Sequence, residues 1–97
     1  MAKRILIAED SASVRKFVTL ALKLDNFEVI QAIDGMEALE KLANNDIDLL
    51  ITDLNMPECD GEMLLKQIKA RPRLHDIPVV VITSAGNPAK ELELMAC

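Results

Sequence analysis

Four short apolar segments punctuate the sequence, at residues 4–8, 27–32, 48–52 and 78–83. Each has the length of a β-strand, is rich in isoleucine and valine, and lacks the regular polar alternation of a half-exposed strand. Strands that are buried on both faces of a parallel sheet show this pattern. We therefore predict four parallel strands in a sheet whose two faces are covered by helices.

Two helices are predicted between the first three strands. The first begins behind Ser11 or Ser13, either of which can cap it, and the second follows the turn at Asp34-Gly35 and ends at Asn44-Asn45. Apolar residues recur at helical spacing in both, so we expect each helix to pack one face on the sheet. The repeating positions are Val14, Phe17, Val18, Ala21, Leu22 and Leu24 in the first helix and Met36, Ala38, Leu39 and Leu42 in the second.

Two further helices continue the alternation. The third is predicted from Asp60-Gly61 to just before Pro72, and the fourth from Pro88, a tolerated first-turn proline, to Cys97. Strands that alternate with helices across short loops form right-handed βαβ units, so we expect one α/β domain over residues 1–97 with an open, doubly wound parallel sheet. Because ligands of such sheets bind beyond the carboxyl ends of the strands, the residues after each strand are the candidate site.

Composition and charge narrow the classes of function. The 97 residues are 51% hydrophobic and 28% charged, as in a soluble globular domain. A net charge of −5 and only two aromatic residues, Phe17 and Phe27, argue against a nucleic-acid partner. Cys59 and Cys97 lack the spacing of a disulfide framework, and a reducing compartment explains them. No apolar run has the length of a signal peptide or membrane span, so we expect a cytoplasmic protein with no membrane partner.

Polar and acidic residues follow three of the predicted strands. Glu9-Asp10 comes after the first strand, Asp53 after the third and Ser84 after the fourth. If the strand order is 2-1-3-4, the first and third strands are neighbours and their carboxylates converge. Two carboxylates about 4 Å apart repel by roughly 4 kcal/mol at an effective dielectric constant of about 20. Either their pKa values rise or a cation binds.

The donor atoms of this acidic group favour Mg²⁺. Carboxylate oxygens without cysteine or histidine suit a magnesium ion, which keeps several waters at about 2.0–2.1 Å. Such an ion leaves coordination positions for phosphoryl oxygens, and a neighbouring carboxylate can act as the nucleophile that becomes an aspartyl phosphate. The sequence thus predicts a magnesium-dependent phosphoryl-transfer site at Glu9, Asp10 and Asp53.

Three motifs resemble the signature of response-regulator receiver domains, the CheY-like family. They are Glu9-Asp10-Ser11, Asp53-Leu54-Asn55-Met56-Pro57 with Gly61, and Thr83-Ser84-Ala85. The resemblance runs from Lys3 to the last residue, and the motifs occur in the order and on the elements that the family uses. It implies a flavodoxin-like fold with strand order 2-1-3-4, here shortened to about four strands and four helices.

The resemblance also implies a function in two-component signal transduction. Asp53 would accept a phosphoryl group from the phospho-histidine of a histidine kinase or phosphotransfer protein. Glu9 and Asp10 would position Mg²⁺, with the Asp53 carboxylate and the backbone carbonyl of Asn55 as further ligands. Ser84 would hydrogen-bond the phosphoryl group and switch a protein-binding surface that a downstream target reads. The domain would promote its own phosphorylation and dephosphorylation without being a turnover enzyme.

The sequence departs from the receiver pattern at its C-terminal end. A receiver continues into a fifth strand, which ends in a lysine, and a fifth helix, whereas this sequence stops at Cys97 and Lys90 falls inside the predicted fourth helix. We expect a C-terminally incomplete receiver with uncovered apolar surface over the first, third and fourth strands, which homodimerisation or strand exchange would cover. Mg²⁺ binding should persist in part, while phosphorylation and switching should be impaired.

Three other functions stay open. A flavin-binding domain would carry a hydroxyl- and amide-rich phosphate loop where Glu9-Asp10 stands. A haloacid-dehalogenase-type phosphatase needs a second aspartate two residues after its nucleophile, where this chain has Asn55. A phosphorylation-impaired module that only binds other proteins is the third. Binding of Mg²⁺ and of beryllofluoride separates these functions.

Overall fold

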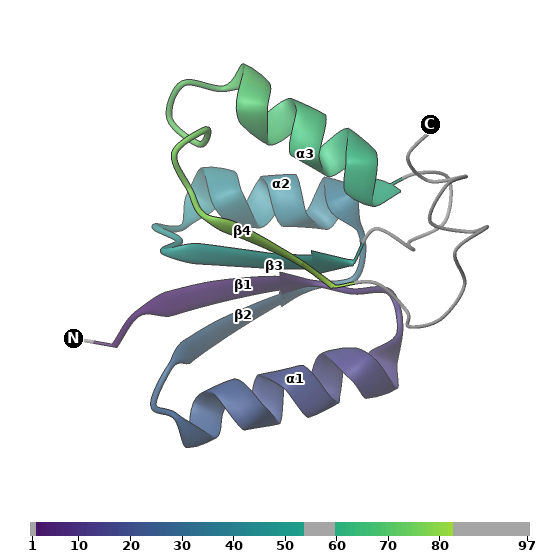
Figure 1. Ribbon diagram of the computed structural model, residues 1–97, viewed down its shortest axis with the longest axis vertical. Helices are drawn as coiled ribbons and strands as arrows, with labels where there is room; N and C mark the ends of the chain where they lie inside the picture. Colours follow the sequence, from purple (N-terminus) through teal and green to yellow (C-terminus); the bar gives the residue numbers. More distant parts are fainter. Residues whose placement is uncertain (1, 54–59, 83–97) are drawn as a thin grey trace.

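The protein folds as a four-stranded parallel sheet with helices on both faces. The computed structural model describes residues 2–53 and 60–82. The strands are β1 (Arg4–Ala8), β2 (Glu28–Ala32), β3 (Leu49–Asp53) and β4 (Val79–Ile82), and the helices are α1 (Ala12–Leu24), α2 (Gly35–Asn44) and α3 (Asp60–Ala70). The strand order is β2-β1-β3-β4, which confirms the predicted topology (Figure 1). The predicted fourth helix lies outside the described residues.

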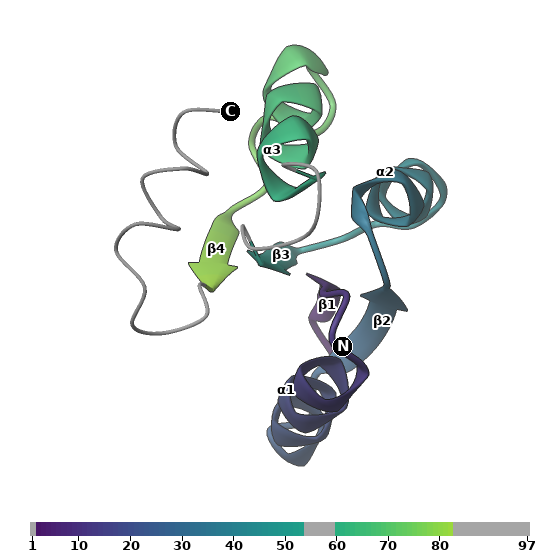
Figure 2. The ribbon, with the colours of Figure 1, turned by 90° about the vertical axis from the view of Figure 1, so that its right-hand side faces the viewer.

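The helices form one layer on each side of the sheet. Figure 2 shows α1 on one face and α2 and α3 on the other, as the apolar strands predicted. Each face has its own core. Ile5, Ile7 and Ile51 form the buried centre on the α1 side, where Val18 and Leu22 pack against them. On the other side the buried apolar residues are Leu6, Ala8, Ala32, Ala38, Leu42, Ile47, Leu50, Leu64, Ile68 and Leu74.

The register of the strands places the carboxyl ends of β1, β2 and β3 side by side at one edge of the sheet. Ala8, the last residue of β1, pairs with Ala32 of β2 and with Thr52 of β3. Since Glu9 follows Ala8 and Asp53 follows Thr52, the acidic residues of the sequence motifs leave the sheet at the same edge. Parallel pairing of β1 with β3 is therefore the feature of the fold that positions the candidate site.

Local chemistry sets the ends of the first two helices. Ser11 caps α1, because its hydroxyl accepts from the Val14 N–H at 3.4 Å, which resolves the choice between Ser11 and Ser13. Asp34 caps α2 by accepting from the Glu37 N–H at 2.8 Å. Glu37 adds a negative charge to the first turn of that helix, where the helix dipole favours it.

The turn from α1 to β2 is a Schellman motif. Asn26 adopts a left-handed conformation with φ of 66°, which asparagine tolerates better than most residues. The Phe27 N–H reaches back to the Leu22 carbonyl at 3.2 Å, and the Asn26 N–H to the Lys23 carbonyl at 3.0 Å. This closure carries Phe27 onto the α1-side core, where Leu22 also packs.

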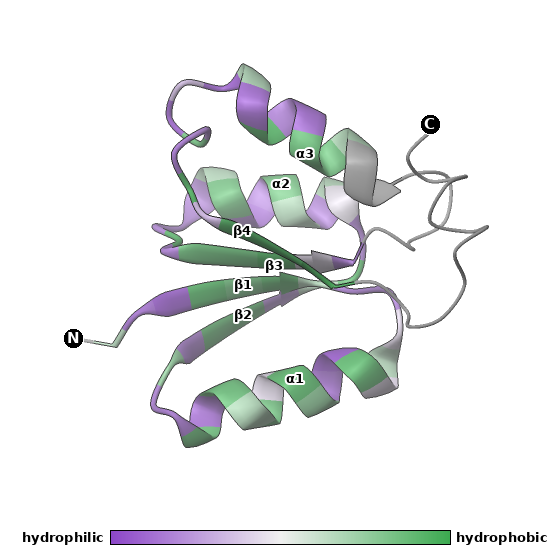
Figure 3. Ribbon diagram, in the orientation of Figure 1, coloured by the Kyte–Doolittle hydropathy of each residue, from purple (hydrophilic) through white to green (hydrophobic). Residues whose placement is uncertain are grey.

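Several helix positions expected to face the sheet are exposed instead. Phe17 is 74% exposed, Leu24 85% and Met36 67%, so the prediction that they pack inward is wrong. Helix α1 meets the sheet along Val18 and Leu22, which lie one turn apart, and the apolar stripe of the helix is wider than this line of contact. Figure 3 shows hydrophobic residues along the strands and interspersed with hydrophilic ones on α1.

The expected uncovering of the sheet is confined to its edge. Ile7 of β1 is fully buried and Ile51 of β3 is 8% exposed, so these two side chains do not form the bare apolar surface that was expected over their strands. The partly exposed valines Val80 and Val81 lie in β4, at the edge of the described sheet. Helix α1 packs on β1 and β2, and Ile51 of β3 is buried in one cluster with Ile5 and Ile7. Self-association stays a prediction.

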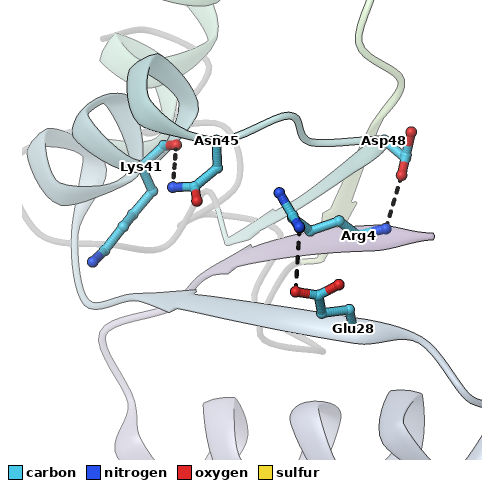
Figure 4. Close-up of polar contacts among 5 residues, drawn as sticks. All are labelled: Arg4, Glu28, Lys41, Asn45 and Asp48. Carbon is cyan, nitrogen blue, oxygen red and sulfur yellow. Dashed lines mark hydrogen bonds and ion pairs between the residues drawn. The ribbon is translucent and has the colours of Figure 1, made fainter. Parts of the chain in front are cut away.

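Ionic and polar contacts fasten the amino-terminal end of the sheet. The Arg4 N–H donates to the Asp48 carboxylate at 2.8 Å, and the Arg4 Nε lies 3.4 Å from the Glu28 carboxylate (Figure 4). The Asn45 side-chain amide donates to the Lys41 carbonyl at 2.9 Å, at the end of α2.

Among the described residues, no helix combines the length and the apolar composition that a membrane span requires.

Candidate functional site

Three carboxylates meet where β1 and β3 end. Glu9, Asp10 and Asp53 each offer an oxygen, and these atoms all lie within 4.8 Å of one another, as the strand order predicted. Glu9 is 2% exposed and Asp53 7%, whereas Asp10 is exposed. Ser84 and the Asn55 carbonyl lie outside the described residues, so their parts in the site stay predictions, and Cys59 and Cys97 lie outside them too.

Glu9 is held in place through its backbone and its side chain. Its N–H donates to the Ala32 carbonyl of β2 at 3.0 Å, and its carbonyl accepts from the Arg15 Nη1 at 2.7 Å. Its carboxylate accepts from the Ser11 N–H at 2.9 Å, at the start of α1. Contacts to β2 and α1 thus fix Glu9 in the geometry that the site requires.

The electrostatics of the group reflect like charges in a buried place. Burial, above all, raises the pKa of Glu9 from 4.5 to about 7. The hydrogen bond from the Ser11 N–H opposes the rise, while contacts with Asp53 and Asp10 and the charge of Asp53 add to it. Glu9 therefore changes its charge near neutral pH. A cation among these carboxylates would favour its ionised form.

The donor set fits Mg²⁺. The cluster offers carboxylate oxygens only, which a hard divalent cation prefers, and it contains no cysteine or histidine. Two of its members are buried and would be desolvated ligands, while exposed Asp10 leaves the group open to solvent on one side. The raised pKa of Glu9 shows that its charged form is disfavoured in the metal-free site, and a bound cation would stabilise that form.

Two residues near the site were missed by the sequence analysis. Arg15 donates from Nη1 to the Glu9 carbonyl at 2.7 Å and from Nε to the Gln31 Oε1 at 3.2 Å. A signal for Arg15 existed, because a cation in the first turns of a helix opposes the helix dipole and calls for another reason to be there. Gln31 carried no such signal, since an exposed glutamine at a strand end is common.

A surface hollow elsewhere in the molecule is separate from this chemistry. It has a volume of about 510 Å³, runs along α2, and is lined by residues that include Met36, Leu39 and Arg71. Its lining contains none of the three clustered carboxylates. We therefore assign the candidate site to the acidic cluster at the end of β1 and β3.

Comparisons with known proteins agree with this site. Residues 5–97 match the family model described as response regulator receiver domain. The chain is 40% identical over 89 residues to chemotaxis protein CheY1 of Helicobacter pylori, covering 90% of this chain and 72% of that protein. It is 35% identical over 89 residues to the chemotaxis protein CheY homolog of Campylobacter jejuni, covering 90% and 68%.

A solved structure shares the fold along almost the whole chain. The chemotaxis response regulator CheY4 of Vibrio cholerae superposes with a TM-score of 0.83 at 31% identity, covering 99% of this chain and 80% of that one. These matches do not favour the flavin-binding, phosphatase or interaction-only alternatives. The sequence motifs, the strand order and the matches lead to one conclusion: the chain belongs to the family of response regulator receiver domains, with homologues of CheY among its relatives.

Proposed function

We propose that Asp53 is the phosphoryl acceptor of this receiver and that Glu9 and Asp10 hold Mg²⁺ beside it. As a receiver domain of two-component response regulators, the chain is a signal-transduction module. One observation carries the assignment of residues. Asp53 ends the buried strand β3 and is 7% exposed, and its carboxylate lies within 4.8 Å of ligand atoms of Glu9 and Asp10.

The proposed reaction is a displacement at phosphorus. An oxygen of the Asp53 carboxylate attacks the phosphorus of a phospho-histidine, a P–O bond forms, and the P–N bond breaks with its electron pair going to the imidazole. A carboxylate has no proton to give up before it attacks, so the protein mainly has to position the groups and neutralise charge. The result is an aspartyl phosphate on Asp53.

Several residues are assigned roles in binding Mg²⁺ and the phosphoryl group. Mg²⁺, when bound, would neutralise the carboxylates and the phosphoryl oxygens. Glu9 is buried and held by β2 and α1, so it supplies a carboxylate fixed in position, whose ionised form a bound cation would favour, while Asp10 is the exposed carboxylate of the group. We assign the Asp53 carboxylate and the Asn55 carbonyl as the further protein ligands of the ion, and the hydrogen bond to the phosphoryl group to Ser84.

The partners follow from the reaction. The proposed donor is a histidine kinase or phosphotransfer protein, because the chain belongs to the receiver family of two-component systems. The phosphoryl group then adds negative charge to the carboxyl edge of the sheet, and a downstream target protein would read the change through Ser84 and the residues after it. The domain acts as a phosphoacceptor and does not turn over a substrate as an enzyme does.

Acetyl phosphate labelling tests this proposal. The chain is incubated with acetyl phosphate with and without Mg²⁺, and intact mass spectrometry follows the added phosphoryl group. We expect magnesium-dependent labelling of the parent chain and none in Asp53→Asn. The labelling should be slow in the 97-residue chain, which lacks the lysine that ends the fifth strand of a receiver. The matched control is Asp48→Asn, which neutralises the carboxylate just before the same strand and should be labelled like the parent.

Two outcomes would count against the proposal in different ways. Equal labelling of Asp53→Asn and the parent would show that another residue accepts the phosphoryl group. Binding of Mg²⁺ without any labelling of the parent would reject the phosphoacceptor function for this chain. That second result would favour the phosphorylation-impaired module that only binds other proteins.

A further inference from the structure

Arg15 contacts the acidic site without belonging to it. It lies in the second turn of α1, where its own N–H donates to the Ser11 carbonyl at 2.9 Å, so the helix fixes its backbone. Its guanidinium turns back to the strand ends. Nη1 donates to the Glu9 carbonyl at 2.7 Å, and Nε donates to the Gln31 side chain at 3.2 Å.

The carbonyl that Arg15 binds belongs to the peptide between Glu9 and Asp10. A peptide group is planar, so fixing its oxygen also fixes the direction in which the chain enters Asp10. Glu9 has further restraints from the Ala32 carbonyl and the Ser11 N–H. The Arg15 contact therefore restrains the peptide that leads into Asp10, the exposed carboxylate of the cluster.

The arginine fork suits this task because it donates to two acceptors at fixed angles. The Glu9 carbonyl lies directly after β1, and the Gln31 side chain belongs to β2, so the guanidinium joins α1 to the end of β1 and to β2. Lysine could supply the charge but not two donors in a rigid plane. Gln31 in turn sets the rotation of the guanidinium by accepting from Nε.

We propose that Arg15, oriented by Gln31, is a positioning residue for the Mg²⁺ site. It holds the Glu9–Asp10 peptide so that the carboxylates present a preformed set of oxygens. The inference rests on the proposed function, since it concerns the same metal site. It assigns Arg15 no contact with the ion or with the phosphoryl group.

A purely electrostatic role for Arg15 predicts the opposite result. A positive charge beside a cation site repels the cation, so removing that charge should tighten Mg²⁺ binding. Loss of a positioning contact should weaken it, because outer-shell partners of metal ligands typically affect affinity by about 10- to 100-fold. The sign of the change in the Mg²⁺ dissociation constant therefore separates the two roles.

Isothermal titration calorimetry with Mg²⁺ alone, at about pH 8.5 where Glu9 is mostly ionised, tests the proposal. We expect Arg15→Met to raise the dissociation constant about tenfold. Arg15→Lys should lie between the parent and Arg15→Met. Lys16→Met is the matched control, because it removes the same charge from the next, exposed residue of the same helix, and it should leave the constant within about twofold.

Gln31→Leu supplies a second line of evidence. Gln31 is exposed, so this variant should fold even if Arg15→Met does not, and it should weaken Mg²⁺ binding by about two- to threefold. Added to Arg15→Met, it should have no further effect, since Gln31 acts through the guanidinium. The melting temperatures of the metal-free variants identify any loss of folding.

An unchanged or lower Mg²⁺ dissociation constant in folded Arg15→Met would overturn the inference. So would a parent-like constant in Gln31→Leu if Arg15→Met fails to fold. If the parent itself binds no Mg²⁺, the proposed function fails and this inference with it. If the parent binds Mg²⁺ and Asp53 is labelled, the proposed function stands whatever the Arg15 variants show.

Discussion

The two ends of the sheet hold acidic residues in opposite ways. At the amino-terminal end, Arg4 lies between two of them: its N–H donates to Asp48, and its Nε lies 3.4 Å from Glu28. The side chains of the ion pair are 34% and 54% exposed. At the carboxyl end, Glu9 and Asp53 are buried next to each other, with Asp10 beside them.

The difference teaches how to tell a structural charge from a functional one. Exposed opposite charges gain little from each other and need nothing else to be stable. Burying carboxylates raises the free energy of the folded state, and the pKa of Glu9 rises for this reason above all, with its acidic neighbours adding to the rise. A ligand that offsets the charge is the simplest reason for a fold to retain such a group.

The largest expected effect on stability comes from neutralising Glu9. Its pKa is higher in the folded protein than in the unfolded chain, so its contribution is fully present below about pH 4.5 and is lost as pH rises through about 7. Glu9→Gln keeps the side-chain oxygen that accepts from Ser11. At about pH 8 without metal, it should raise the free energy of unfolding by about 2–3 kcal/mol.

Urea unfolding of the parent and Glu9→Gln at several pH values measures this effect. The difference between the two should be small at about pH 4, grow between about pH 4.5 and 7, and level off above about pH 7. Glu28→Gln at the amino-terminal end is the control, and its difference from the parent should stay small at every pH. A difference for Glu9→Gln that does not depend on pH would contradict the account of its pKa.

The next effect concerns the affinity for Mg²⁺. Asp10→Asn replaces a charged oxygen with a neutral one and should raise the dissociation constant at least about tenfold, or about 1.4 kcal/mol. Asp48→Asn makes the same chemical change at the other end of the sheet and should leave the constant unchanged. Calorimetric titration measures both. Equal Mg²⁺ binding by Asp10→Asn and the parent would remove Asp10 from the site.

The smallest effect is expected for the ion pair at the amino-terminal end. Arg4→Met keeps much of the apolar stem and should lower the free energy of unfolding by less than about 1 kcal/mol, because the pair is partly exposed. The loss should shrink at high salt, and the Mg²⁺ dissociation constant should not change. A larger loss, in thermal unfolding followed by circular dichroism, would show that the two ends are more alike than we infer.

Much of the fold could be predicted from local patterns. Continuous apolar runs gave the four strands, and Ser11 and Asp34 marked the helix starts, because caps and buried strands leave strong local signals. The exposure of individual helix side chains could not be predicted as well as the strands and the helix starts. Phe17 and Met36 fit a helical stripe but lie in solvent, since only the packed structure decides how wide the contact is.

The acidic cluster could be predicted only by combining motifs with topology. Each acidic residue alone had an ordinary explanation as a cap or a strand end, and the adjacency of β1 and β3 made them one group. Arg15 and Gln31 were not predicted: the position of Arg15 near the start of a helix hinted at a role, but its contacts to the residues at the ends of β1 and β2 depend on the packed structure.

Proton release on Mg²⁺ binding tests the central claim most directly. If the cation binds among buried carboxylates that include Glu9, binding at about pH 7 should release about half a proton per ion, and almost none at about pH 8.5. Calorimetry in two buffers of different ionisation enthalpy measures this number. Binding with no proton release at about pH 7, or no binding at all, would contradict the account.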